Sequence, residues 1–275
     1  MLARSLAAGR IRLEYPPGDE ETAGMIAGAC EEALSLAQSR WGLGPPSNCH
    51  LYVMTSWRDF IFRSAPWSWK FMLGLTFPAW SPRARRTWPY SAGWTQRYGR
   101  KVAIGIKPPR LLEVSDKSIG ARIYVEEKDM RAKVRHVACH ELIHAASAHL
   151  ALPAWLNEGL AAVSVDQFMG YPTIREDSLS LVQHYLPKRP PRSYQQLSRL
   201  QGEAIAYHSV RGYWIVRLLE KTYSGFLREL LSKRRTAEDL ERRVADVLHL
   251  PRGRIWAEID DLMADSFQVA TPAAS

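Results

Sequence analysis

Apolar residues recur at helical spacing in one segment near the start of the chain and through nearly all of its second half. Between Asp19 and Trp41, Ala, Met, Ile and Leu return every three or four residues after an acidic start, and Gly42 and Gly44 follow. This pattern predicts an amphipathic helix that ends at the glycines. The same spacing predicts further helices over Asp129–His149, Pro153–Phe168, Glu203–Tyr223, Gly225–Lys233, Ala237–Leu248 and Arg254–Phe267.

Short β-branched and aromatic runs predict a small sheet in the first half of the chain. The runs HLYVMTS from His50, KVAIGI from Lys101 and ARIYVEE from Ala121 are typical of strands, and WRDFIFR after the first run predicts a short helix. The residues from Ala65 to Tyr98 combine several tryptophans and prolines with little periodicity. We expect this segment to be a long loop packed onto the core.

The order of these elements, with strands and helices first and helices alone afterwards, predicts an α+β fold and not a repeating βαβ one. We expect an N-terminal lobe, residues 1–128, with a small sheet and helices, and a mainly helical C-terminal lobe, residues 129–275, that together form one unit. Residues Leu186–Leu200, with PKRPPRSYQQL, are the best candidate for a linker, and we expect the tail after Phe267 to be loose.

With 275 residues, 46% of them hydrophobic and 24% charged, the chain has the composition of a folded protein with a substantial core. Its net charge of +9 favours an acidic partner such as nucleic acid or anionic lipid. The basic residues are nevertheless scattered, with clusters near Arg85 and Arg234, and no nucleic-acid-binding motif accompanies them. We therefore expect no specific nucleic acid as partner and interpret most of the charge as solvated surface.

Three cysteines, Cys30, Cys49 and Cys139, form no CxxC pair, which argues against a disulfide framework and a thiolate metal site and favours a reducing compartment. The first residues lack the sustained apolar run of a signal peptide. The longest apolar run, Phe71–Trp80, is far below the roughly 20 residues that span a bilayer. We expect a cytoplasmic protein without a transmembrane segment, although a mature form that had lost its leader would look the same.

The sequence HELIH places His140 and His144 one turn apart on one face of a predicted helix. Two imidazoles can then reach one metal ion, while Glu141, about 100° round the helix, can act as a general base on water. Apolar neighbours such as Val137 and Ile143 predict that the helix is buried, where unpaired polar groups would cost about 1–3 kcal/mol each. A metal ion would provide the missing partners. The alternatives are a polar helix pair joined by hydrogen bonds and a purely structural zinc.

A tetrahedral catalytic zinc usually takes three protein ligands, and Glu158 in ALPAWLNEGLA is the candidate for the third. Pro153 suits the first turn of a second helix, and Glu158 falls about a turn and a half into that helix. An antiparallel second helix would present its carboxylate to the same metal. Gly159, next in the chain, permits a close approach between helices.

These residues resemble the gluzincin zinc metallopeptidases, in which HExxH is completed by a downstream Glu in an Asn/Ser-Glu-Gly-Leu/Phe-Ala setting. With HELIH and LPAWLNEGLA close together, the chain most resembles the small peptidase MA-like family, over most of its length and most strongly from His140 to Ala161. The stretch AIAYHSVRGYWIVRLLEKTYSGF resembles the helix that follows the metal helices in that family. The resemblance implies a zincin-like fold with the site between the two lobes.

The resemblance also implies a hydrolase, a metalloprotease that holds one zinc ion on the three ligands above and cleaves peptide or protein substrates. Glu141 is then the general base that takes the proton of the attacking water. Tyr207 matches the family's tyrosine over the zinc and would donate a hydrogen bond to the oxyanion, with His208 as a second candidate. We also expect one of the strands KVAIGI and ARIYVEE to offer its edge to an extended substrate.

One position departs from thermolysin-like sites, because their Asp four residues after the Glu ligand is Ala162 here. Asp166 or a backbone carbonyl is then expected to orient a histidine. His136, one turn before His140, is a further candidate ligand, although a packed or solvent-facing role is more common. Two other functions stay open, namely a zincin-fold scaffold protein that cleaves nothing and a basic nucleic-acid-associated protein. The stretch Trp67–Trp94, with its interleaved basic residues, also allows a membrane-surface or nucleic-acid patch.

Overall fold

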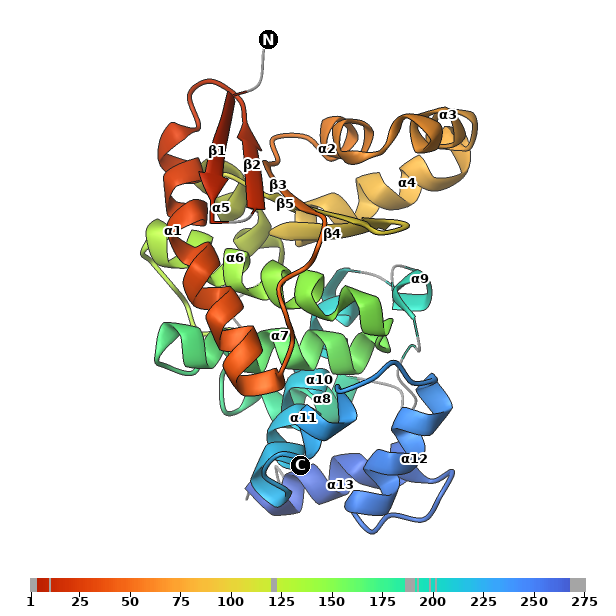
Figure 1. The fold of residues 1–275 in the computed structure, drawn as a ribbon. Coiled ribbons are helices and arrows are strands. Elements are labelled where there is room, and N and C mark those ends of the chain that lie inside the picture. Colours follow the sequence, from red (N-terminus) through yellow and green to blue (C-terminus); the bar gives the residue numbers. More distant parts are fainter. Residues whose placement is uncertain are drawn as a thin grey trace.

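The computed structural model describes residues 4–9, 11–119, 123–185, 191, 193–197, 199–200 and 202–267. These residues form a small mixed sheet with helices in the N-terminal half and a mainly helical C-terminal half, so the predicted α+β fold is confirmed (Figure 1). One hydrophobic core cluster contains Leu13 and Ile104 from the first half and Leu160 and Ile259 from the second. The two predicted lobes therefore share a core.

The five-stranded sheet within the described residues has the order β1-β2-β3-β5-β4. Its strands are β1 (Arg4–Ala8), β2 (Ile11–Tyr15), β3 (Cys49–Val53), β4 (Gly93–Tyr98) and β5 (Lys101–Ile106). β2, β3 and β5 are parallel, whereas β1 and β4 pair antiparallel with β2 and β5. The two predicted strands at HLYVMTS and KVAIGI are confirmed, and the second of them is an interior strand. The edge of the sheet beyond it is β4.

The two faces of the sheet are covered differently because side chains alternate along each strand. Leu51 and Ile104 lie in the main core with helix α1 (Glu20–Leu36), which a π-helical turn, η1 (Ala37–Trp41), prolongs. Tyr52 and Ala103, their neighbours in sequence, belong to a second cluster with residues of α2 (Trp57–Ser64). The predicted helices at 19–41 and at WRDFIFR are thus confirmed.

The helices predicted after residue 128 are all present. They are α6 (Met130–Ser147) with its 3-10 extension η3 (Ala148–Leu150), α7 (Ala154–Met169), α10 (Gly202–Thr222), α11 (Phe226–Leu230), α12 (Ala237–Val247) and α13 (Ile255–Phe267). Helix α7 packs against α6 and, very closely, against α10. A Cβ on Gly159 would lie 2.2 Å from the carbonyl oxygen of Gly212, so the expected close approach at Gly159 is confirmed.

Two predictions in the first half are wrong. The segment 65–98 is not a loop, because it contains α3 (Trp67–Leu75), α4 (Phe77–Thr87), the 3-10 turn η2 (Trp88–Tyr90) and β4. Pro66 and Pro78 stand at the starts of these helices, where the missing N–H costs nothing, so these two prolines did not signal a loop, whereas Pro82 lies inside α4. The run ARIYVEE is not a strand in its described part, where only Tyr124 forms an isolated bridge, to Ile174.

Other elements were not predicted at all. They are β1, β2, α5 (Pro109–Ile119), α8 (Ser178–Tyr185) and α9 (Tyr194–Leu197). Helix α9 falls within the predicted linker, of which 186–190 lie outside the described residues, as does the tail after Phe267. None of the described helices is both long enough and apolar enough to cross a bilayer. All three cysteines are buried and free.

Candidate metal centre

Helix α6 brings two imidazoles together beneath the sheet. The helix starts at Asp129, whose carboxylate accepts a hydrogen bond from the backbone N–H of Arg131, and most of its second half is buried. His140 and His144 project from one face, with ring centroids 4.6 Å apart and Nε2 atoms 3.0 Å apart. The predicted pairing of the two histidines on one face is therefore present.

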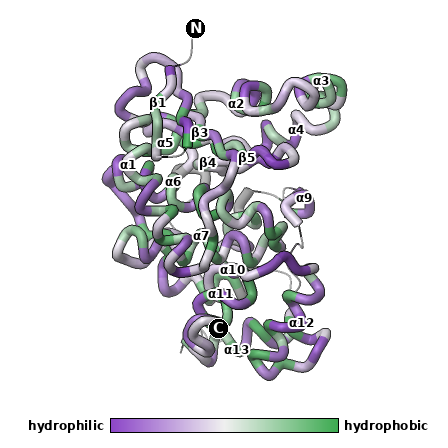
Figure 2. Tube along the Cα trace, viewed as in Figure 1, coloured by the Kyte–Doolittle hydropathy of each residue, from purple (hydrophilic) through white to green (hydrophobic). Residues whose placement is uncertain are grey.

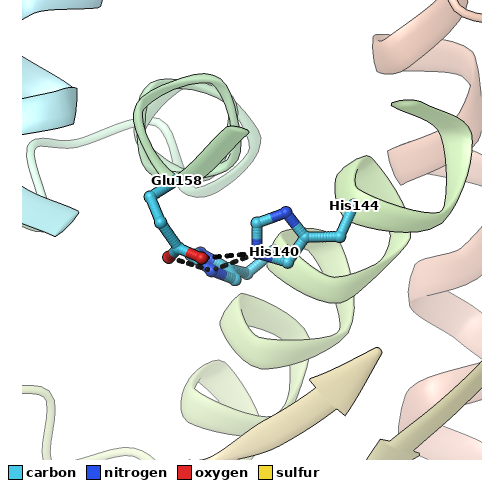
Figure 3. A group of neighbouring side chains, drawn as sticks. All are labelled: His140, His144 and Glu158. Atoms are coloured by element: carbon cyan, nitrogen blue, oxygen red, sulfur yellow. Dashed lines mark hydrogen bonds and ion pairs between the residues drawn. The ribbon is translucent and has the colours of Figure 1, made fainter. Parts of the chain in front are cut away.

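Helix α7 adds the carboxylate of Glu158. Its Oε2 lies 3.4 Å from His140 Nε2 and its Oε1 lies 3.4 Å from His144 Nε2, and Figure 3 shows the three side chains converging between the helices. Ligands about 2.0–2.2 Å from a tetrahedral zinc ion lie about 3.3 Å from one another. Two imidazole nitrogens and a carboxylate separated by 3.0–3.4 Å therefore fit three corners of a zinc site. The three side chains that the sequence singled out as candidate ligands thus lie together.

The ionisation of these side chains is set by their removal from water and by one another. Burial by itself would lower the pKa of His144, but the charge and hydrogen bond of Glu158, with the charge of Glu141, raise it to about 9. Burial by itself would raise the pKa of Glu158, but the two neighbouring histidines hold it well below its usual range. The carboxylate is therefore ionised at neutral pH, as a metal ligand must be.

A chain of hydrogen bonds holds the Glu158 carboxylate in place. The hydroxyl of Tyr194 donates to Oε1 over 2.7 Å and accepts from the side-chain amide of Asn157 over 2.6 Å. The carbonyl oxygen of that amide accepts from the hydroxyl of Ser147 on α6, 2.7 Å away. The hydroxyl of Ser209, on α10, donates to Oε2 over 3.3 Å. Both carboxylate oxygens thus have a fixed direction, which favours a defined coordination geometry.

Glu141 lies under the edge strand β4. Its side chain is buried, and its Oε2 accepts a hydrogen bond of 2.7 Å from the hydroxyl of Thr95 on β4. A Cβ on Gly93, at the start of the same strand, would lie 2.7 to 2.9 Å from the Glu141 side chain, so a larger residue there would displace that side chain. The charge of Glu141 acts on His144 and on Tyr194, which places it beside the three ligands and not among them.

The other predicted site residues lie at different distances from the cluster. His208 is buried and lines one small pocket together with Glu158. Burial, and then the charge of Arg211, lowers the pKa of His208 to about 4, so it is neutral at pH 7. Tyr207 is buried in the core, and the tyrosine whose hydroxyl contacts the cluster is Tyr194. A catalytic role of Tyr207 stays a prediction.

Asp166 and His136, two further candidates near the site, stand outside the three-residue cluster found in the described residues. Asp166 accepts hydrogen bonds from the backbone and hydroxyl of Thr173 and from the hydroxyl of Tyr213, so its carboxylate ties α7 to α10. Burial, and then the charge of His140, lowers the pKa of His136. His136 is not part of the three-residue metal cluster found in the described residues. Sequence reasoning missed the residues that hold Glu158 and Glu141, namely Ser147, Asn157, Tyr194, Ser209, Gly93 and Thr95.

Comparison with known proteins does not extend this picture. No protein-family model matches the chain, and no curated protein matches it significantly. The resemblance to gluzincins therefore rests on HELIH, on the NEGLA segment and on the geometry of His140, His144 and Glu158.

Proposed function

We propose that the protein is a zinc-dependent metallopeptidase of the gluzincin type. The observation that carries the proposal is the grouping of His140 Nε2 and His144 Nε2, 3.0 Å apart, with the Glu158 carboxylate, whose two oxygens each lie 3.4 Å from one of them. A second carboxylate, that of Glu141, lies on the helix of the two histidines. A structural zinc site is usually closed by four protein ligands, whereas a catalytic one keeps a position open. Three ligands next to a buried Glu141 are therefore the donor set that favours hydrolysis.

The residues of the chain divide the work as follows. A zinc ion bound by the three ligands supplies Lewis-acid chemistry, which makes water acidic enough to attack near neutral pH. Glu141 accepts the proton of the attacking water and delivers it to the leaving amine. Thr95 positions the Glu141 carboxylate through their 2.7 Å hydrogen bond. Tyr194 is oriented by Asn157 and donates its one hydroxyl proton to Glu158 in the structure. When Glu158 holds the metal, that proton would turn from Glu158 to the oxyanion of the tetrahedral intermediate.

The substrate would lie along β4. Both strands expected to offer an edge are unsuitable, because KVAIGI is the interior strand β5 and ARIYVEE forms no strand in the described residues. β4 is the edge strand on that side of the sheet, and it contacts Glu141 through Gly93 and Thr95. An extended peptide that pairs with the outer edge of β4 would have its backbone held by hydrogen bonds without a particular sequence.

Metal content is the first test. Protein purified without a histidine tag is expected to contain one zinc ion per chain, and His144→Ala and Glu158→Ala are each expected to lose it. His149→Ala is the matched control, because His149 is exposed just after α6 and its Nδ1 contacts only the Ala146 carbonyl among the contacts of the described residues. No metal in the wild type after zinc addition would refute the proposal.

Catalysis is the second test, with a peptide-library cleavage screen on the zinc-loaded protein. Glu141→Gln is isosteric and is expected to abolish cleavage while zinc content stays at the wild-type level. A wild type that binds zinc but cleaves nothing would favour the scaffold alternative. Tyr194→Phe is expected to lower kcat by about 10²-fold or more with zinc retained. Tyr207→Phe, compared with it, shows which tyrosine acts on the substrate.

A further inference from the structure

Helices α3 and α4 form a hairpin that projects from the sheet, away from the helical half of the molecule (Figure 1). Its base is held by aromatic packing: Phe77 and Trp80 of α4 contact each other and the ring of Trp57 on α2, at centroid distances of 5.2–6.2 Å. The indole N–H of Trp80 donates to the Leu73 carbonyl over 3.0 Å and joins α4 to α3. The hairpin is thus a fixed structure, although neither of its helices has a buried residue.

One face of α3 is apolar and turned to solvent. Trp67, Phe71 and Leu75 are spaced four residues apart, so they form one stripe along the helix. Their exposed fractions are 86%, 73% and 69%, and Met72 beside them is 52% exposed. The tube at α3 includes a hydrophobic, green-coloured stretch in Figure 2. Single exposed apolar side chains are normal on a protein surface, whereas large ones grouped in this way mark a contact surface.

The stretch of sequence that contains the hairpin is basic throughout. Residues 60–112 contain ten lysines and arginines and no acidic residue, whereas the rest of the chain has 27 basic against 28 acidic residues. This segment therefore carries the whole excess of positive charge. Four of its cations are on the hairpin, and none of them forms an ion pair within the described part of the chain: Lys70, Arg83, Arg85 and Arg86.

We propose that the α3–α4 hairpin docks the protein onto the surface of an anionic lipid bilayer, with Trp67, Phe71 and Leu75 inserted among the acyl chains and the cations of the hairpin at the headgroups. Helices that lie in the membrane interface combine Trp, Phe and Leu on one side with Lys and Arg on the other. Docking through one projecting hairpin needs no membrane-spanning helix. The inference goes beyond the proposed peptidase activity and does not depend on it.

Lipid explains the composition of the hairpin better than the other partners do. Single-stranded nucleic acid would use aromatic rings for stacking, but Leu75 and Met72 have no ring to stack and are more exposed than Trp69, which is 45% exposed. The core of a protein interface is depleted in charged residues, whereas the hairpin carries four cations and no acidic residue. An apolar stripe next to a purely cationic flank matches a bilayer with anionic headgroups.

The experiment is co-sedimentation of the full chain with vesicles of phosphatidylcholine and phosphatidylserine and, in parallel, of phosphatidylcholine alone. Wild-type protein is expected to bind the anionic vesicles, and to bind them less tightly at high salt. Trp67→Ser/Phe71→Ser/Leu75→Ser is expected to weaken binding by about tenfold for each side chain removed from the acyl region. Arg83→Gln/Arg85→Gln/Arg86→Gln is expected to weaken it by about fivefold per charge.

Matched controls separate docking from folding and from metal binding. Val114→Ser/Val125→Ser removes apolar side chains that are 56% and 45% exposed outside the hairpin, and it is expected to bind vesicles like the wild type. His144→Ala is expected to do the same. Far-UV circular dichroism confirms that each variant is folded, which is expected because the substituted hairpin residues have no buried role.

Three results would overturn the proposal. The first is a wild type that binds neither kind of vesicle, and the second is a triple apolar variant that still binds as the wild type does. The third is a hairpin that serves another partner. In that case the wild type would not bind vesicles, and the triple variant would have lost either self-association in analytical ultracentrifugation or salt-dependent retention on single-stranded RNA.

Discussion

Helices α7 and α10 pack so closely that adding one methyl group between them should measurably lower the free energy of unfolding. Gly159 and Gly212 face each other at the crossing, and a Cβ on Gly212 would lie 2.1 Å from the Trp155 carbonyl oxygen. Carbon and carbonyl oxygen normally stay about 3.3 Å or more apart. Gly212→Ala therefore requires the two helices to separate by about 1 Å, because the obstacle is backbone and cannot rotate away.

The expected cost follows from two opposing terms. Overpacking a core costs about 1–3 kcal/mol, and a clash with a carbonyl belongs at the upper end of that range. Alanine regains about 1 kcal/mol of helix propensity relative to glycine. The free energy of unfolding should therefore fall by about 2 kcal/mol, as measured by urea denaturation followed by circular dichroism.

The matched control is Gly28→Ala on α1, where a Cβ would meet nothing within 4 Å. Only the propensity term acts at that position, so the control should gain up to about 1 kcal/mol. Gly212→Ala should also lower zinc affinity, because Glu158 precedes Gly159 and its helix has to move. If Gly212→Ala were as stable as the wild type, or as stabilised as Gly28→Ala, the close crossing of α7 and α10 would be wrong.

Three further predictions concern other buried contacts. Arg211 is 1% exposed and makes hydrogen bonds of 2.9 and 2.7 Å to Asp260. Asp260→Asn should therefore lower the free energy of unfolding, measured in urea, by about 3–5 kcal/mol, and a loss below about 1 kcal/mol would contradict the buried pair. Burial lowers the pKa of Lys107 from 10.5 to about 8. Between these two pH values the unfolded chain binds the proton more tightly than the folded protein does. The free energy of unfolding should therefore rise by up to about 3 kcal/mol as the pH increases through that window. Lys107→Met should abolish this rise, and an unchanged pH dependence of the denaturation midpoint would assign it to another group. Gly93→Ala should push the Glu141 side chain aside and lower cleavage by about 10²-fold while zinc content is kept, so full activity would show that this carboxylate is not positioned by β4.

The spacing of apolar residues predicted the helical half well, because each helix there has apolar residues at helical spacing and recognisable residues at its ends. The segment HELIH needs only helix geometry to place His140 and His144 on one face, and a single turn at Pro153 suffices to return Glu158 to them. Gly159 was likewise predictable, since a glycine beside a candidate ligand indicates a close helix contact.

The failures are at places where long-range contacts override the local signal. In residues 65–98, Pro66 and Pro78 stand at helix starts and α4 tolerates Pro82 in its interior. The aromatic side chains of this segment pack on α2 and on one another, which periodicity does not reveal. The strands β1 and β2 are short and gain their stability from pairing. ARIYVEE has a strand-like composition, yet its described part has one bridge only.

The sequence by itself determined the α+β class, the helices after residue 128 and the identity of the three candidate ligands, because these depend on spacing within one or two adjacent helices. Only the tertiary structure decided what surrounds those ligands. Tyr194 reaches Glu158 across 36 residues, and Thr95 reaches Glu141 across 46, through β4 at the edge of the sheet. Such contacts are set by how the elements pack, and no local pattern encodes which distant hydroxyl will meet a given carboxylate.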